Sequence, residues 1–133
     1  MYEGKIYVLL VEDNKSYSEI IQQVLEFKGY KVKCAYDGVQ AIDAAINEVF
    51  DLILIDNQMP LMDGFTAVKT IRTFNDKIPI ISISCENDDE FINRCYENGM
   101  NMHIPKFSIF KAIQNNLIES CVNQENYMLK VKI

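Results

Sequence analysis

The sequence predicts an α/β domain in which five parallel strands form one doubly wound sheet with five helices on its two faces. Short apolar runs of strand length recur along the chain, and segments of helical periodicity separate them. Such strict alternation is typical of parallel strands joined by right-handed crossovers. The length of 133 residues is that of one domain able to bury most of its apolar surface.

The five predicted strands differ in how they are covered. They are Ile6–Val11, Val32–Tyr36, Leu52–Ile55, Ile78–Ser84 and Met102–Ile104. The first, third and fourth are nearly continuous in Ile, Leu and Val, as expected of strands with helices on both faces. In the second, Val32 and Cys34 alternate with Lys33, which is typical of an edge strand.

Each predicted helix shows one apolar stripe with spacings of three and four residues. The stripes are Tyr17, Ile20, Ile21, Val24 and Leu25; Val39, Ile42, Ile46 and Val49; Phe65, Val68, Ile71 and Phe74; Phe91, Ile92, Cys95 and Tyr96; and Phe110, Ile113, Leu117 and Cys121. Asp37 and Asn87 each precede a Gln or Glu by three residues, which predicts capping boxes. Gly29 and Gly99 predict the ends of the first and fourth helices.

The composition excludes several classes of function. A net charge of −6 disfavours direct nucleic-acid binding, which needs clustered Lys and Arg. No apolar run approaches the roughly 18 residues of a membrane-spanning helix. No secretory signal is visible, so we expect a cytoplasmic protein with no membrane contact. The expected partners are another protein or a small ligand.

The four cysteines, Cys34, Cys85, Cys95 and Cys121, form no close pair in the sequence. Their spacing matches neither a redox CxxC motif nor a zinc site. A chain of this size needs no disulfide to fold. We therefore expect buried free thiols.

Polar side chains follow four of the predicted strands. Glu12 and Asp13 follow the first, Asp56 ends the third, Ser84 ends the fourth, and Lys106 closely follows the fifth. Ligands of open α/β sheets bind beyond the carboxyl ends of the strands. The sequence therefore places three carboxylates, a hydroxyl and an ammonium group at one edge of the sheet.

Each carboxylate alone has a simpler interpretation, since acids after strands often cap the next helix, as Asp13 or Asn14 could do. As a set they repel one another unless a cation compensates their charge. Oxygen ligands without His or Cys suit a hard divalent ion such as Mg²⁺. With Ser84 and Lys106 beside it, such a site suits phosphoryl transfer to Asp56, with Glu12 and Asp13 holding the metal.

The chain closely resembles the receiver domain of two-component response regulators. The matching stretches are VLLVEDN (8–14), LILIDNQMPLMDG (52–64), PIISIS (79–84) and the segment 99–106. The resemblance runs from residue 5 to about residue 121. It implies a flavodoxin-like fold with strand order 2-1-3-4-5, a receiver domain over residues 1–121, and a tail or linker over 122–133. The tail could equally be a frayed helix end or a short strand. DNQMPLMDG is also similar to receivers of hybrid histidine kinases and phosphorelays.

The resemblance also implies a metal site and a phosphodonor. Asp56 would take a phosphoryl group from the phosphohistidine of a histidine kinase or a histidine phosphotransfer protein, giving an aspartyl phosphate. Glu12, Asp13, Asp56 and the backbone carbonyl of Gln58 would bind Mg²⁺.

By the same resemblance, Ser84 turns toward the phosphoryl group and Lys106 pairs with it. The face made by the fourth helix, fifth strand and fifth helix would then change its affinity for a downstream protein. Such a domain supports its own phosphorylation and dephosphorylation and is not a free-standing enzyme. Both a monomer and a phosphorylation-dependent dimer are compatible with the sequence.

Two positions depart from the family pattern. The family lysine is usually followed by a cis proline, whereas Phe107 follows Lys106 and Pro105 precedes it. A cis bond before Phe would cost about 3 kcal/mol, so we expect a trans bond and a differently held lysine. His103 stands where the family has the Tyr or Phe that swings inward. It is either a surface or satisfied polar residue, or a switch that makes the response pH-dependent.

The sequence disfavours three other functions. An aspartyl-phosphate phosphatase would have a second Asp two residues after the nucleophile, where this chain has Gln58. Flavodoxin-like cofactor binding would need a Ser, Thr or Gly-rich loop after the first strand, and no GxxxxGK or GxGxxG motif is present. The complete set of acids, Ser84 and Lys106 disfavours a receiver that no longer accepts phosphate, with Phe107 the one reservation.

Overall fold

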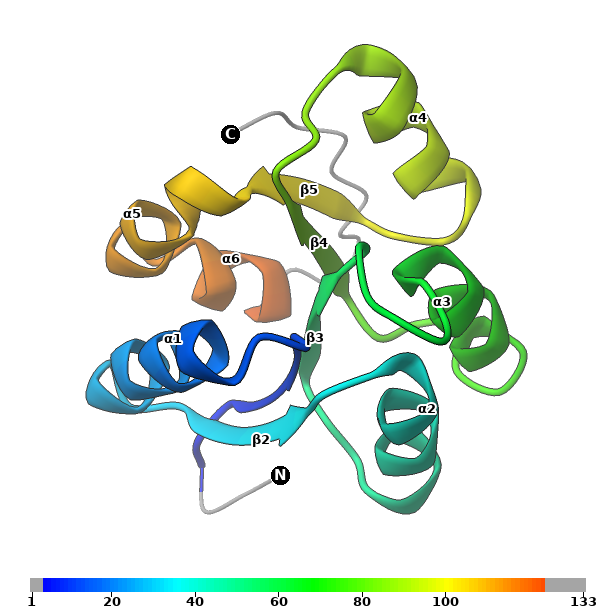
Figure 1. Ribbon diagram of the computed structural model, residues 1–133. Helices are drawn as coiled ribbons and strands as arrows, with labels where there is room; N and C mark the ends of the chain where they lie inside the picture. The colour runs from blue at the N-terminus through cyan, green and yellow to red at the C-terminus, as the bar shows by residue number, and fades with distance from the viewer. Residues whose placement is uncertain (1–3, 124–133) are drawn as a thin grey trace.

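The computed structural model describes residues 4–123, in which five parallel strands lie between two layers of helices (Figure 1). The strands are β1 (Tyr7–Val11), β2 (Lys31–Ala35), β3 (Leu52–Asp56), β4 (Ile80–Ser84) and β5 (Met102–Pro105). Their order in the sheet is β2-β1-β3-β4-β5, with every pair parallel. The predicted fold class, strand order and edge position of the second strand are confirmed, with strand ends shifted by one or two residues.

The helices cover both faces of the sheet. They are α1 (Lys15–Phe27), α2 (Gly38–Asn47), α3 (Gly64–Arg72), α4 (Asp89–Glu97), α5 (Ile109–Gln114) and α6 (Leu117–Asn123), with a 3₁₀ turn at Lys106–Ser108. α1, α5 and α6 pack on one face, and α2, α3 and α4 on the other (Figure 1). Among the described residues, no helix has the length and apolar character needed to cross a membrane.

Two apolar clusters hold these layers together. Successive residues of the central strands point to opposite faces, so Leu10 and Leu54 belong to the cluster under α1 and α5. Leu9 and Ile53 belong to the cluster under α2 and α3. All four are fully buried, and burial of each such side chain contributes roughly 1.5–3 kcal/mol. The two buried clusters therefore hold the carboxyl ends of the strands rigidly in place.

The helix starts confirm some predicted caps and correct one. Asn14, rather than Asp13, caps α1, and Asp37 caps α2 as predicted. The predicted cap at Asn87 is wrong by one residue, because Asp88 accepts a hydrogen bond of 2.8 Å from the Phe91 N–H. The buried side chains of α4 are Phe91, Ile92 and Cys95.

The predicted fifth helix is divided into α5 and α6. Asn116 has a φ of +63°, a left-handed conformation that Asn tolerates better than most residues and that ends α5. The apolar stripe nevertheless continues across the break, since Ile113 and Cys121 are both buried. Val122 and Asn123 belong to α6, and the predicted tail beyond them lies outside the described residues.

The cysteines follow the expectation only in part. None of the four forms a disulfide, and Cys95 and Cys121 are buried. Cys34 is half-buried and Cys85 is exposed. The predicted burial is therefore wrong for Cys85, which lies in the loop after β4, where no helix covers it.

Candidate functional site

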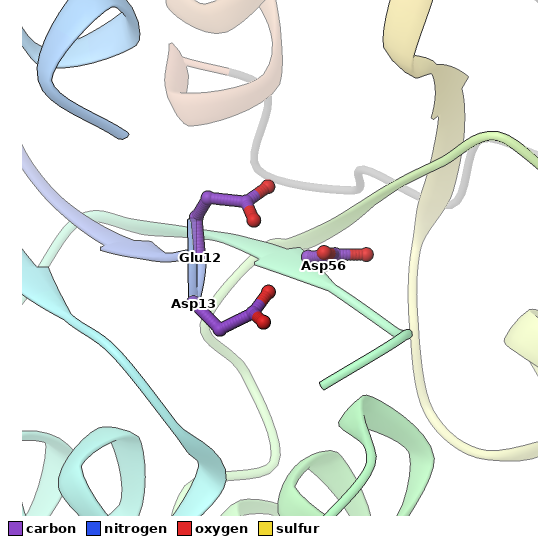
Figure 2. Close-up of side chains that lie close together, drawn as sticks. All are labelled: Glu12, Asp13 and Asp56. Atoms are coloured by element: carbon purple, nitrogen blue, oxygen red, sulfur yellow. The ribbon is translucent and has the colours of Figure 1, made fainter. Parts of the chain in front are cut away.

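Three carboxylates meet at the carboxyl edge of the sheet. Oxygen atoms of Glu12, Asp13 and Asp56 all lie within 4.8 Å of one another. Figure 2 shows Glu12 and Asp13 leaving the end of β1 beside Asp56 at the end of β3. Glu12 and Asp56 are 0% and 1% exposed, whereas Asp13 is open to solvent. The sequence predicted this cluster, and the structure brings its members together.

Strand register explains why these acids are neighbours. Val11 pairs with Ile55, so the next residue of each strand, Glu12 or Asp56, lies at the same level of the sheet. The Glu12 N–H also donates to the Ala35 carbonyl at 3.0 Å, which continues the pairing of β1 with β2. The backbone at the site is therefore fixed by the ladder of the sheet and not by a free loop.

Lys106 reaches this cluster from the end of β5. Its Nζ atom lies 3.0 Å from Glu12 Oε1 and 3.2 Å from Asp56 Oδ2. All peptide bonds between residues 4 and 123 are trans, including the one before Phe107. The trans bond therefore leaves Lys106 within ion-pair distance of both buried acids.

Burial shifts the titration of both buried acids. Burial, reinforced by the charge of Asp56, raises the pKa of Glu12 to about 7. Lys106 and the Asn14 N–H, 3.1 Å from Glu12 Oε2, offset part of that shift. Burial also raises the pKa of Asp56, against the Gln58 N–H that donates to Asp56 Oδ1 at 3.0 Å.

Lys106 responds in the opposite sense to the acids around it. Burial disfavours its charge, but the hydrogen bond to Glu12 and the charge of Asp56 outweigh burial and raise its pKa. Lys106 thus stays protonated. One ammonium group faces three carboxylates, so negative charge remains in excess at the site.

This donor set suits a hard divalent cation. All three side chains offer oxygen, and Asp13 leaves the site open to solvent. A cation that keeps several waters and takes a few carboxylates, as Mg²⁺ does, matches such a half-open cluster. The backbone of Gln58 also lies at the site, since its N–H contacts Asp56.

Ser84 lies at the end of β4, beside β3. It is fully buried, and its Oγ accepts a hydrogen bond from the Glu86 N–H at 3.1 Å. The pairing of Asp56 with Ile83 places Ser84 one residue further along the same edge. The hydroxyl proton remains available for donation to a group bound at Asp56.

His103 is buried, so the interpretation of it as a surface residue is wrong. Its Nδ1 lies 3.2 Å from the Ser82 Oγ, its partner in the pairing of β4 with β5. Its ring also packs edge-on against Phe91, with centroids 5.2 Å apart. Burial lowers the pKa of His103, and the backbone of Glu86 opposes part of this shift. The ring thus points inward, toward α4.

Sequence reasoning missed two contributions to the site. Asn57 accepts a hydrogen bond of 2.8 Å from the Phe65 N–H, and a Cβ at Gly64 would lie only 2.8 Å from the Asn57 Cα. In the sequence, Asn57 directly after Asp56 and Gly64 in the same motif could have predicted that the start of α3 lies against the end of β3. Tyr17 contacts Lys106 through both its ring and its hydroxyl, yet in the sequence it was only one member of an apolar stripe.

Comparison with known proteins decides the family. The sequence model described as the response regulator receiver domain matches residues 8–118. This chain belongs to that family. Receiver domains accept phosphoryl groups from histidine kinases or phosphotransfer proteins and bind Mg²⁺ in an acidic pocket. The predicted function, a phospho-accepting domain of two-component signalling, is confirmed at this level.

Similar receiver domains occur in proteins of different architecture. The chain is 34% identical over 117 residues to the transcriptional regulatory protein ZraR of Salmonella typhimurium, covering 88% of this chain and 26% of ZraR. It is 32% identical over 126 residues to the osmosensing histidine protein kinase SLN1 of Saccharomyces cerevisiae, covering 90% of this chain and 10% of SLN1. The chain therefore spans about a quarter or less of these relatives, one of which is a histidine kinase.

A solved receiver-domain structure is also similar to this chain. The receiver domain of the sensor histidine kinase PA1611 from Pseudomonas aeruginosa has a TM-score of 0.83 and 28% identity. The similarity covers 91% of this chain and all of that one. That structure is described as having a magnesium ion coordinated in its active-site cleft.

Proposed function

We propose that Asp56 is the phosphoacceptor of this receiver domain. The observation that carries the proposal is the position of its carboxylate, buried at the end of β3, beside Glu12 and Asp13, and paired with Lys106 at 3.2 Å. The end of a strand holds its side chain rigidly, and the neighbouring Lys106 ammonium suits a group that must receive a phosphoryl dianion.

The reaction proposed is transfer from a phosphohistidine of a histidine kinase or histidine phosphotransfer protein. An Asp56 carboxylate oxygen attacks phosphorus, and an O–P bond forms as the N–P bond breaks. The electron pair of the broken bond returns to the imidazole nitrogen, and the ring leaves neutral with its proton on the other nitrogen. The product is an aspartyl phosphate.

The remaining site residues have distinct proposed roles. Lys106 neutralises charge on the phosphoryl oxygens, and the Ser84 hydroxyl donates a hydrogen bond to one of them. Glu12, Asp13, Asp56 and the Gln58 carbonyl would hold Mg²⁺. When bound, the ion supplies further charge neutralisation and aligns the phosphoryl group.

We further propose that the domain acts as a switch and not as a free-standing enzyme. The Gln58 side chain lacks an acid/base group, and its amide donates to Glu86 Oε1 at 3.0 Å. The readout proposed is a change in the α4-β5-α5 face for a downstream protein, in which Ser84 and His103 are the candidate switch residues. Monomer and phosphorylation-dependent dimer, and a cytoplasmic location, stay predictions.

The acceptor assignment is tested by incubating the purified protein with Mg²⁺ and acetyl phosphate. We expect one hydroxylamine-labile phosphoryl group by intact-mass measurement, absent in Asp56→Asn. Asp43→Asn, the same change at an exposed position of α2, is the matched control and should label normally. Labelling that survives in Asp56→Asn would refute the assignment.

A further inference from the structure

We propose that Tyr17 is a positioning residue that holds Lys106 at the phosphoacceptor site. The inference rests on the proposed function, because it concerns how the lysine is presented to Asp56. The contact joins helix α1 to the end of β5, two segments that are distant in sequence but adjacent in the fold.

Tyr17 contacts both the backbone carbonyl and the side-chain ammonium of Lys106. The Tyr17 hydroxyl donates to the Lys106 carbonyl at 3.2 Å, which holds the backbone where the 3₁₀ turn begins. The Lys106 Nζ lies over the Tyr17 ring, 5.0 Å from its centroid. A ring face attracts an ammonium group through its quadrupole. One side chain thus restrains the main chain and the charged tip of the same lysine.

Tyr17 is itself fixed. Its N–H donates to the Asn14 side chain at 3.0 Å in the first turn of α1. Its ring packs edge-on against Phe110 of α5, with centroids 6.3 Å apart and planes at 72°. A half-buried ring held from two sides can position a flexible partner without losing much freedom of its own.

The contacts of Tyr17 with Lys106 matter most when the electrostatic attraction of the carboxylates for Lys106 is weakened. In the structure, Glu12 and Asp56 hold the Nζ by charge, at 3.0 and 3.2 Å. These carboxylates would share their charge with a divalent cation bound beside them, and their pull on Nζ would fall. The attraction of the neutral Tyr17 ring and the hydrogen bond to the Lys106 carbonyl do not depend on that charge. Tyr17 therefore keeps the lysine near Asp56 as the phosphoryl group arrives.

Two substitutions separate the two contacts. Tyr17→Phe keeps the ring and loses the hydroxyl, whereas Tyr17→Leu keeps apolar bulk and loses the ring. We expect Tyr17→Leu to slow labelling by acetyl phosphate about fivefold, the size of a partly exposed cation–π contact, and Tyr17→Phe to slow it less. Tyr36→Leu is the matched control, because it removes a tyrosine ring that lies 5.3 Å from a different ammonium, that of Lys15.

The double variant distinguishes positioning from packing. If Tyr17 acts through Lys106, Tyr17→Leu has no further effect on the labelling rate in a Lys106→Ala background. An equal slowing in both backgrounds, or no slowing by Tyr17→Leu alone, would overturn the proposal. Circular dichroism melting of each variant confirms that the rates compare folded proteins.

A second readout does not depend on phosphotransfer. Proton NMR of the unphosphorylated protein should show Lys106 ε-methylene signals shifted upfield by the ring, in the wild type and in Tyr17→Phe but not in Tyr17→Leu. Ordinary lysine shifts in the wild type would overturn the inference even if Asp56 is labelled. If the wild type takes no phosphate, the acceptor proposal fails, while the upfield shift still establishes the hold on Lys106.

Discussion

At the scale of single residues, two buried acids share one lysine while a third acid faces solvent. The carboxylates of Glu12 and Asp56 are costly to ionise where they lie, and the pKa of each is raised for that reason. Asp13, in contrast, is exposed. The site therefore combines a rigid, buried cluster of charged groups with an open side through which a cation or a phosphodonor can enter.

His103 gives a prediction at this scale. Because burial lowers its pKa, we expect the folded protein to show an imidazole pKa below the ordinary value of 6.5. The folded protein favours the neutral form of the imidazole. The contribution of His103 to the free energy of unfolding is therefore fully present above pH 6.5 and is lost as the pH falls below that value. A switch driven by protonation of His103 would accordingly act at acidic rather than neutral pH.

A proton NMR titration measures this pKa directly, because the chain contains a single histidine. The same titration in concentrated urea gives the value for the unfolded chain. A folded-state pKa at or above the unfolded value would contradict the buried, neutral ring beside Ser82. His103→Phe should remove the loss of stability that this ring contributes as the pH falls below 6.5.

At the scale of elements, α4 connects the site to the proposed output face. It begins at its Asp88 cap, and Phe91 packs against His103 of β5. Ser84 at the end of β4 and Glu86 in the loop before α4 meet through a hydrogen bond of 3.1 Å. A movement of the Ser84 side chain would therefore occur only a few residues before α4, the helix proposed to change the output face.

The cap of α4 can be tested by a pair of neighbouring substitutions. Asp88→Ala removes the acceptor for the Phe91 N–H and should lower the free energy of unfolding by about 1 kcal/mol. Asn87→Ala is the control and should stay within about 0.5 kcal/mol of the wild type. Urea denaturation measures both. Equal losses would show that the helix start is shared between the two residues.

At the scale of the whole molecule, the burial and mutual repulsion of acidic groups at the site oppose the stability of the fold. The chain carries a net charge of −6, and three of its carboxylates converge at one edge of the sheet. Because the folded-state pKa of Glu12 is raised to about 7, its ionisation destabilises the fold. That cost is absent below pH 4.5, grows between the two values, and is complete above about pH 7.

Glu12→Gln should therefore stabilise the metal-free protein at pH 8, by about 1–3 kcal/mol, and have little effect at pH 4.5. Adding Mg²⁺ should stabilise the wild type, since a ligand of the folded state shifts the unfolding equilibrium, and should stabilise the variant less. Urea unfolding at both pH values, with and without Mg²⁺, measures the effect. Glu19→Gln, at an exposed position of α1, is the control. A loss of stability in Glu12→Gln at pH 8 would show that the Lys106 ion pair outweighs the cost of burial and repulsion.

The sequence by itself determined the sheet and the acidic edge. Apolar runs and helical stripes are local patterns, and they set the order of strands and helices. Parallel strands all end at the same edge, so the residues that follow them must be neighbours. For this reason Glu12, Asp13, Asp56, Ser84 and Lys106 could be placed together without coordinates.

Only the tertiary structure decided the contacts between distant segments. The burial of His103 depends on Ser82 and Phe91, which come from β4 and α4. The hold of Tyr17 on Lys106 depends on how α1 packs beside the turn after β5. Periodicity reports which face of an element is apolar, but it carries no information about which side chain of another element will lie against it.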